Sequence, residues 1–211
     1  MTSIRAAWRH GRDLLLLADS PSPALEARLL LGHVLGHDHA YLVAHDDEPL
    51  LSDALIAYEA LLQRAAAGEP IPYLLGHAPF MGLEFVVSPA VLIPRPETEQ
   101  LVESALAWAR GREPLRVVDV GTGSGCIAVS LATHLDGQMV AVDVSAAALA
   151  VAAVNVAHHV PDRVCLVRGD LLAALAPSFD LITANLPYVA ADEWPTLPIG
   201  VKSYEIGRAH V

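Results

Sequence analysis

The sequence has few basic residues, and this restricts the classes of molecule that the protein can bind. Its 211 residues contain 13 Lys and Arg against 24 Asp and Glu, which gives a formal net charge of −11. Nonspecific binding to nucleic acid depends on basic side chains that neutralise phosphates, so the balance argues against such binding and leaves open only a local basic patch. The charge is compatible with a basic protein partner, although solubility alone explains it.

Long apolar runs and cysteines are also scarce. No apolar run reaches the roughly 18 residues of a membrane span. The run LLLLA at 14–18 is far shorter, and no small-residue cleavage site follows it as a signal peptide requires. Two cysteines are too few for a disulfide framework in a chain of this length. The sequence therefore predicts a cytoplasmic protein without membrane association.

The chain divides into three parts by pattern. Residues 1–70 are helical, because 24–36 and 52–68 place apolar residues at helical spacing and each ends on glycine. Residues 71–95 are rich in proline and contain APFM and EFVV around a Gly-Leu pair, which predicts a hairpin linker. The third part, 96–211, begins with a helix that has Pro96 near its first position.

Short apolar runs alternate with helical segments in this third part. The pattern predicts an α/β, Rossmann-like fold built from βαβ units with a parallel sheet. The predicted strands are 115–121, 138–145, 163–170 and 179–185, and the predicted helices between them are 125–135 and 146–159.

A glycine-rich turn and two acidic residues follow successive predicted strands. The sequence DVGTGSG places Gly121, Gly123 and Gly125 between a strand and a helix, where the backbone turns tightly and a ligand approaches it closely. Asp143 ends the next strand, where an acid accepts hydrogen bonds from ribose hydroxyls. Asp170 ends the third strand and is placed to face an adenine edge. The Gly-x-Gly-x-Gly spacing differs from that of dinucleotide enzymes and favours S-adenosylmethionine; a turn that serves only helix–sheet packing is the alternative.

The stretch ANLPYVA, 184–190, follows the fourth predicted strand and places acceptors for a planar nitrogen there. Such a nitrogen is a poor nucleophile because its lone pair is delocalised. The side-chain oxygen of Asn185 and the backbone carbonyl of Leu186 can accept hydrogen bonds from the two N–H groups of this nitrogen. The nitrogen lone pair then faces a methyl donor. Pro187 stiffens the turn and Tyr188 offers a flat face for the substrate. The alternative is an ordinary turn at a strand end.

Together these motifs resemble the release-factor glutamine methyltransferases (PrmC/HemK). The resemblance rests on GEPIPYLLGHAPFMGLEF (68–85), VLIPRPETE (91–99), the glycine turn, the two acids and Asn-x-Pro-Tyr. It implies a class I S-adenosylmethionine-dependent methyltransferase domain, partial within 96–211, after a helical substrate-recognition domain. It also implies methyl transfer to the side-chain amide of the glutamine in the Gly-Gly-Gln motif of peptide chain release factors, with no direct nucleic-acid partner.

The resemblance assigns roles to individual residues. Asn185, Pro187 and Tyr188 are the predicted catalytic residues, and the substrate amide is held by 185–188, including Leu186. No metal is implied. The predicted cofactor-binding residues are Gly121, Thr122, Gly123, Ser124, Gly125, Asp143, Asp170, Leu171 and Asn185.

One departure from the family pattern keeps an alternative open. The family usually has Asn-Pro-Pro-Tyr, whereas residue 186 is Leu here, and Asn-Leu-Pro-Tyr is typical of ribosomal-RNA adenine dimethyltransferases. An adenine-N6 methyltransferase acting on RNA or DNA is therefore the alternative function, and a basic face would favour it. A non-catalytic binding domain is a further alternative, against which the intact glycine turn and Asn185 speak.

Several other residues have two possible interpretations. Thr98 and Glu99 either line the cofactor pocket or belong to a capped helix start. Cys126 is either a thiol acidified at a helix start or a small core residue. His33 and His37 would share a helix face, but no carboxylate–histidine signature accompanies them, so we expect no metal site.

The end of the sequence departs from the family. A sheet of this family has more strands than the four recognised here, and after Glu205 the residues IGRAHV match nothing in it. The segment EIGRAHV can also be encoded by a sequence that reads like a common sequencing adapter. Our hypothesis is that the natural protein continues beyond Glu205 and that 206–211 are not its own.

Overall fold

The computed structural model describes residues 2–112, 114–173, 175, 178–186 and 204. These residues belong to two compact units, one that runs to Leu75 and also includes Tyr204, and one that starts at Gly76. The residues 206–211 singled out above lie outside the described part, as does most of the segment that precedes them. In the described part, no helix combines the length and the apolar character that crossing a membrane requires.

The first unit is helical, as its sequence pattern predicts. Its core centres on Tyr58, which is fully buried and donates a hydrogen bond from its hydroxyl to the carbonyl oxygen of Ala27 at 3.0 Å. A side chain at Gly11 would overlap that hydroxyl, so glycine allows the first and fourth helices to approach closely. The helices are α1 (Ile4–Leu17), α2 (Pro23–Leu35), α3 (His39–Ala44), α4 (Ser52–Ala66) and α5 (Ile71–Leu75).

The second unit begins with the predicted hairpin. Strand β1 (His77–Phe80) pairs antiparallel with β2 (Leu83–Val86). Met81 and Gly82 form the two-residue turn, and both have positive φ, at 50° and 74°. Two central residues with positive φ match the twist of the flanking strands, which explains why this short connection is stable.

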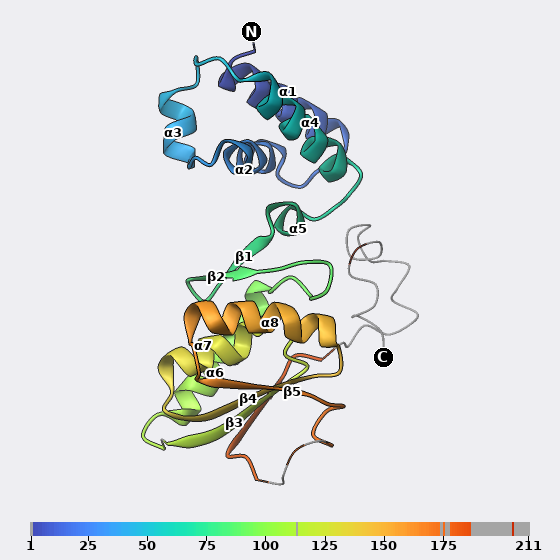
Figure 1. The fold of residues 1–211 in the computed structure, drawn as a ribbon. Helices are drawn as coiled ribbons and strands as arrows, with labels where there is room; N and C mark the ends of the chain where they lie inside the picture. Colours follow the sequence, from blue (N-terminus) through green and yellow to red (C-terminus); the bar gives the residue numbers. More distant parts are fainter. Residues whose placement is uncertain (1, 113, 174, 176–177, 187–203, 205–211) are drawn as a thin grey trace. The chain divides into compact units, whose positions relative to one another are not determined.

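A parallel sheet forms the rest of this unit and confirms the predicted α/β fold. Its strand order is β5-β4-β3-β6, so the chain moves from β3 to one side and later returns to the other. Helices α6, α7 and α8 all lie on the same face of the sheet (Figure 1). The strands are β3 (Leu115–Val120), β4 (Gly137–Asp143), β5 (Val164–Arg168) and β6 (Leu181–Ala184), and the helices are α6 (Pro96–Ala109), α7 (Cys126–His134) and α8 (Ala146–His159).

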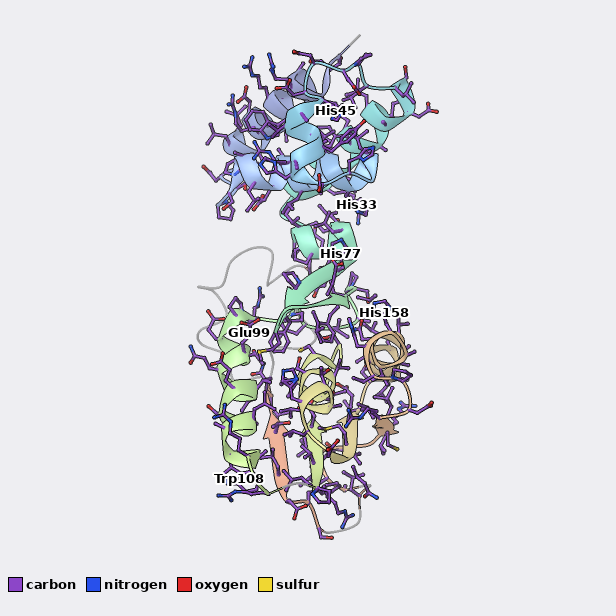
Figure 2. The ribbon with its side chains drawn as sticks, turned by 90° about the vertical axis from the view of Figure 1, so that its left-hand side faces the viewer. His33, His45, His77, Glu99, Trp108 and His158 are labelled. Atoms are coloured by element: carbon purple, nitrogen blue, oxygen red, sulfur yellow. The ribbon has the colours of Figure 1, made fainter. Side chains whose placement is uncertain are left out.

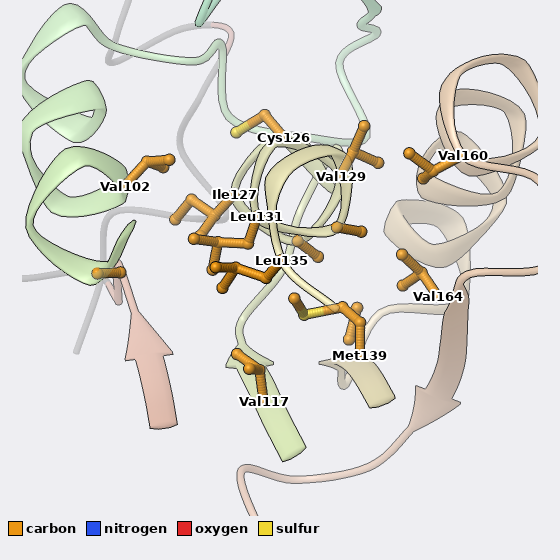
Figure 3. Close-up of a cluster of buried hydrophobic side chains, with 14 of the residues drawn as sticks. Val102, Val117, Cys126, Ile127, Val129, Leu131, Leu135, Met139, Val160 and Val164 are labelled. Carbon is orange, nitrogen blue, oxygen red and sulfur yellow. The ribbon is translucent and has the colours of Figure 1, made fainter. Parts of the chain in front are cut away.

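Helix α7 is the centre of the core on this face. Its side chains are buried around the whole helix from Cys126 to Ala132, as expected of a helix with neighbours on every side. Figure 3 shows Ile127 towards Val102 of α6, and Val129 on the other side of the helix towards Val160, which caps α8. This packing holds the first residues of α7, and with them the end of the glycine turn, rigidly against the sheet.

A buried amide connects the hairpin to the glycine turn. Asn155 of α8 is 1% exposed; its Oδ1 accepts from the backbone N–H of Val86 at 2.8 Å and its Nδ2 donates to the carbonyl of Val86 at 3.0 Å. The same Nδ2 donates to the carbonyl of Ser124 at 2.8 Å. The side chain thus pairs with the edge of β2 as a neighbouring strand would, and fixes the turn at the same time.

Replacing Asn155 with Leu should lower the free energy of unfolding by about 3 kcal/mol or more, because the buried backbone groups of Val86 and Ser124 lose their partner. Urea denaturation of the parent and the variant measures the difference. Val154→Ala, on the same helix but 52% exposed, is the matched control and should change the free energy of unfolding by less than about 1 kcal/mol. Equal stability of parent and Asn155→Leu would contradict this account.

Candidate functional site

Three strand ends meet at one edge of the sheet. Because β3 lies between β4 and β6, the segments that follow these strands are neighbours: the glycine turn, Asp143 and Asn185. In an open parallel sheet, ligands bind beyond the carboxyl ends of the strands, where the order of connection reverses. The connections from β3 lead to β4 and β5 on one side, and β6 lies on the other side of β3. The residues that the sequence predicted therefore lie where this rule expects a binding site.

The glycine turn adopts a conformation that only glycine adopts readily. Gly121, Gly123 and Gly125 have φ of 70°, 56° and 81°. The N–H groups of Gly121 and Thr122 both donate to the carbonyl oxygen of Val142 at 2.9 Å, which ties the turn to β4. Open space lies where a side chain of Gly123 would be, so the backbone there is accessible to a ligand.

Asp143 holds this turn and the loop after its own strand. Its Oδ2 accepts from the N–H of Gly123 and its Oδ1 from the N–H of Ser145, each at 2.9 Å. A carboxylate oxygen has two lone pairs, so each oxygen retains one acceptor position. The side chain is half-buried. Asp143 is therefore oriented by two backbone donors and still able to accept hydrogen bonds from a ligand.

Asp170 and Leu171 follow β5 at the same edge. The N–H of Gly169 donates to the carbonyl oxygen of Asp143 at 3.1 Å, which joins the two strand ends. Asp170 is exposed, and Leu171 has a φ of 48° and is 53% exposed. A large apolar side chain held outward in a strained conformation is available to contact a flat apolar ligand.

Asn185 lies beside the first turn of α6. Its Nδ2 donates to Oγ1 of Thr98 at 3.1 Å. From the described residues, neither Oδ1 of Asn185 nor the carbonyl oxygen of Leu186 accepts a hydrogen bond. The two acceptors that the sequence predicted for a planar nitrogen are thus free of partners in this part of the chain. The other two predicted residues of this motif, Pro187 and Tyr188, lie outside the described residues.

The leucine at the variable position of this motif contacts the glycine turn. A Cβ at Gly121 would lie 2.7 Å from Cδ2 of Leu186, so the leucine side chain covers the α-carbon of that glycine. The contact links the segment after β6 to the turn after β3.

The first turn of α6 contacts two parts of the site. Thr98 is buried and reaches Asn185, while Oε1 of Glu99 accepts from the backbone N–H of Met81 in the hairpin at 2.7 Å. Figure 2 shows Glu99 near one end of α6 and Trp108 near the other. These two hydrogen bonds connect α6 to the segment after β6 and to the hairpin.

Asp119 is a site residue that the sequence reasoning missed. It is completely buried, and its carboxylate accepts from the hydroxyls of Thr122 at 2.6 Å and Thr183 at 2.9 Å. Removal from water raises the pKa of Asp119 to about 6. The sequence did contain a sign of this residue, namely an acid within the apolar strand VVDV. An acid in a buried strand indicates specific hydrogen-bond partners, because a buried carboxylate is costly without them.

A buried hydroxyl at the start of α7 lacks a partner. Oγ of Ser124 is buried, and no hydrogen bond to it is formed by the described residues. This hydroxyl and the open space at Gly123 fit the polar, amino-acid end of a ligand.

Burial decides one of the alternative interpretations. Cys126 is buried, and desolvation raises its pKa to about 12, so it is a core residue and the acidified-thiol interpretation is wrong. Within the described ranges, no group of three or more His, Cys, Asp or Glu side chains is placed to hold a metal ion.

Comparison with protein families matches two parts of the chain. Residues 6–76 match the family described as the PrmC N-terminal domain. Residues 117–198 match the methyltransferase domain. The second match includes the glycine turn and the three strand ends described above.

Similar curated proteins cover most of the chain. A release factor glutamine methyltransferase of Bordetella pertussis is 49% identical over 84% of this chain and 67% of its own length. Those of Koribacter versatilis and Nitratidesulfovibrio vulgaris are 44% and 40% identical over 96% of this chain and 73% and 70% of their own lengths.

Solved structures match smaller parts. A ribosomal protein L11 methylase from Lactobacillus delbrueckii subsp. bulgaricus is 33% identical over 43% of this chain and 46% of its own, with a TM-score of 0.40. Trm5b from Pyrococcus abyssi is 20% identical over 54% of this chain and 34% of its own, with a TM-score of 0.46.

The buried Asp119 predicts a pH dependence of stability. Burial raises its pKa from 3.8 to about 6, so between these values the folded protein keeps a proton that the unfolded chain has released. The folded state therefore loses stability as the pH rises through this window. Asp119→Asn removes this titration, and the free energy of unfolding of the parent relative to the variant should fall by up to about 3 kcal/mol between about pH 4 and pH 6.

Chemical denaturation of both proteins across this pH range measures the relative stability. Only the change with pH is diagnostic, because the variant also alters the bonds to Thr122 and Thr183 at every pH. A difference that stays constant across the window would show that the carboxyl titrates at its ordinary pKa.

Proposed function

This chain belongs to the release factor glutamine methyltransferase family, and from that premise we propose that it transfers a methyl group from S-adenosylmethionine to the side-chain amide nitrogen of a glutamine in peptide chain release factors. The target is the glutamine of their Gly-Gly-Gln motif. The observation that carries the chemistry is the pair of free acceptors after β6, Oδ1 of Asn185 and the carbonyl oxygen of Leu186. The adenine-N6 alternative finds no support in the names of these relatives.

The residues at the strand ends fit the cofactor. S-adenosylmethionine supplies a methyl group on a positively charged sulfur, which is an activated donor. We assign the glycine turn, 121–125, and the buried hydroxyl of Ser124 to its amino-acid end. Asp143, which keeps a free acceptor position on each oxygen, is assigned to the ribose hydroxyls. Asp170 and the exposed Leu171 are assigned to the adenine.

The segment after β6 prepares the glutamine nitrogen. An amide nitrogen is unreactive while its lone pair is conjugated with the carbonyl group. Two fixed acceptors that bind both N–H groups of the substrate amide favour the arrangement in which this lone pair faces the methyl donor. Asn185 and Leu186 provide the two acceptors, and Pro187 and Tyr188 complete the segment in this proposal. A strong general base is not required, because the methylated nitrogen loses its proton after transfer.

Thr98 orients the side chain of Asn185. An asparagine amide can rotate to present either its oxygen or its nitrogen. With Nδ2 bound to the hydroxyl of Thr98 at 3.1 Å, Oδ1 is the atom left for the substrate. Thr98 acts through Asn185 and is therefore a positioning residue. Glu99, the residue after Thr98, bonds to the hairpin and thereby fixes the position of this turn of α6.

We assign recognition of the protein substrate to the helical part, residues 1–70, which the match to the PrmC N-terminal domain supports. The hairpin linker, 71–95, whose first residues form α5 (Ile71–Leu75) of the helical unit, and the methyltransferase domain, 96–211, complete the proposed organisation. A folded release factor exposes more surface than one glutamine, and a separate recognition domain explains how a site for a single amide selects one protein.

The direct test is incubation of the chain with labelled S-adenosylmethionine and a release factor. We expect label on the release factor and none on a release factor whose Gly-Gly-Gln glutamine is changed to alanine. Label that appears only on added RNA or DNA would overturn the proposal and establish the adenine methyltransferase.

Asn185→Ala should reduce kcat on the order of a hundredfold or more, because one of the two acceptors at the reacting nitrogen is lost. Asp143→Ala should instead raise the Kd of S-adenosylmethionine, which calorimetric titration measures separately from turnover. Thermal unfolding of both variants serves as the control, since Asp143 also anchors Gly123 and Ser145. Activity of Asn185→Ala within a few-fold of the parent would refute the assigned role.

Thr98→Val keeps the volume of the buried side chain and removes the hydroxyl that binds Asn185. We expect kcat to fall about tenfold or more with little change in the KM for S-adenosylmethionine, in line with other residues that orient a catalytic group. Thr98→Ser should restore most of the rate. A purely structural role predicts instead that both variants lose stability and that serine restores no turnover.

A further inference from the structure

The helical unit contains a cavity that none of the roles above uses. Its volume is about 210 Å³, and it opens between α1, α2 and α3. Its floor is apolar, with Ile4, Leu31 and Leu42 buried there. The remaining lining residues are Arg5, Trp8, Arg9, Arg28, Val43 and Asp46. We call this cavity the arginine pocket.

The three arginines of the pocket differ in their partners. Arg5 forms two hydrogen bonds of 2.8 Å with the carboxylate of Asp46, so the one acid in the lining is already neutralised. Arg28 lies over the ring of Trp8, 4.9 Å from its centre. Arg9 is exposed and has no hydrogen bond or ion pair with any residue that the structure describes. Asp46 also attracts Arg9, but it is already bonded to Arg5, so the three arginines outnumber the one acid of the lining.

This positive charge is concentrated in an otherwise acidic unit. Residues 1–75 contain five arginines, no lysine and ten Asp or Glu, a net charge of −5. Three of the five arginines line the pocket, and a fourth, Arg12, lies over Trp8 at 5.4 Å. Acids lie close by as well, since Asp13 pairs with Arg12 and Asp47 with Arg5. An exposed charge acts over roughly 10 Å at moderate ionic strength, so a ligand at the pocket responds to the four arginines and to Asp13, Asp46 and Asp47 more than to the rest of the unit.

We propose that the arginine pocket binds an acidic residue and an adjacent apolar side chain on the surface of the release factor. This inference rests on the proposed function. The guanidinium groups suit a carboxylate, and the apolar floor with Trp8 suits the neighbouring side chain, a combination that is enriched in the energetically dominant part of protein interfaces. The acidic remainder of the unit repels a long polyanion, which favours a short acidic segment of protein over nucleic acid.

Arg9→Glu in the full chain tests the pocket without touching the proposed catalytic site. The measurement is the Kd for a release factor whose Gly-Gly-Gln glutamine is changed to alanine, so that binding is observed without methyl transfer. We expect the Kd to rise about fivefold to tenfold and its salt dependence to weaken, because an attraction becomes a repulsion. Because Arg9 is exposed and forms no hydrogen bond or ion pair with a described residue, the thermal unfolding of the variant should match that of the parent.

Arg112→Glu is the matched control. Arg112 lies over Trp108 at 4.5 Å in the second unit, outside the pocket, and its replacement changes the net charge equally. An unchanged Kd for Arg9→Glu, or an equal rise for Arg112→Glu, would overturn the proposal. A loss of affinity for an RNA oligonucleotide without a loss for the release factor would overturn it in favour of nucleic acid. If Arg9→Glu unfolds more readily, Arg9→Gln decides, since it removes the charge alone.

This outcome is separable from that of the proposed function. A parent chain that binds the release factor but methylates no glutamine in it would refute the proposed reaction and leave the pocket standing. A parent chain that methylates the release factor, with Arg9→Glu and Arg9→Gln binding it as the parent does, would refute the pocket alone.

Discussion

The site depends on one buried carboxylate. Asp119 lies in the central strand with no exposure to water and accepts hydrogen bonds from Thr122 in the glycine turn and from Thr183 in β6. Thr122 directly precedes Gly123, which we assign to the cofactor, and Thr183 lies two residues before Asn185, which we assign to the substrate. A buried charge is costly unless it is paired, so the structure keeps it only where both hydroxyls are in place, and this requirement fixes the two strand ends relative to each other.

Other polar side chains extend the same principle to the rest of the second unit. Asn155 joins the hairpin to the glycine turn, and the first turn of α6 joins Asn185 through Thr98 and the hairpin through Glu99. Each bond connects segments that backbone hydrogen bonds do not connect. The site is therefore held by side-chain bonds around a rigid sheet, which is the arrangement that a reaction sensitive to alignment requires.

The two units divide the work in this interpretation. The second unit holds one amide and one methyl donor, and a pair of hydrogen-bond acceptors cannot by itself distinguish one protein's glutamine from another's. The first unit offers what the site lacks, namely an apolar cavity rimmed by arginines on a surface that is otherwise acidic. In this interpretation, the first unit selects the protein substrate by its surface charge. The second unit carries out the chemistry at a single amide.

Much of this was determined by the sequence alone. Apolar periodicity placed α8 and the four parallel strands, and the glycines at 121, 123 and 125 predicted a tight turn, because these are properties of a few consecutive residues. The structure shows that all three glycines have positive φ. The ends of the strands then predicted which residues would gather at one edge. The short helices α3 and α5 escaped notice because one or two turns give too little periodicity to recognise.

Only the tertiary structure decided which side chains meet. Thr98 and Asn185 are 87 residues apart, Val86 and Asn155 are 69 apart, and Asp119 and Thr183 are 64 apart. The roles of Thr98 and Glu99 were open in the sequence, and those of Asp119 and Asn155 were not visible in it. The same holds for the arginine pocket, whose lining comes from three helices and the turn after α3. Such contacts depend on how the elements pack, and no local pattern of residues encodes the distance between two elements.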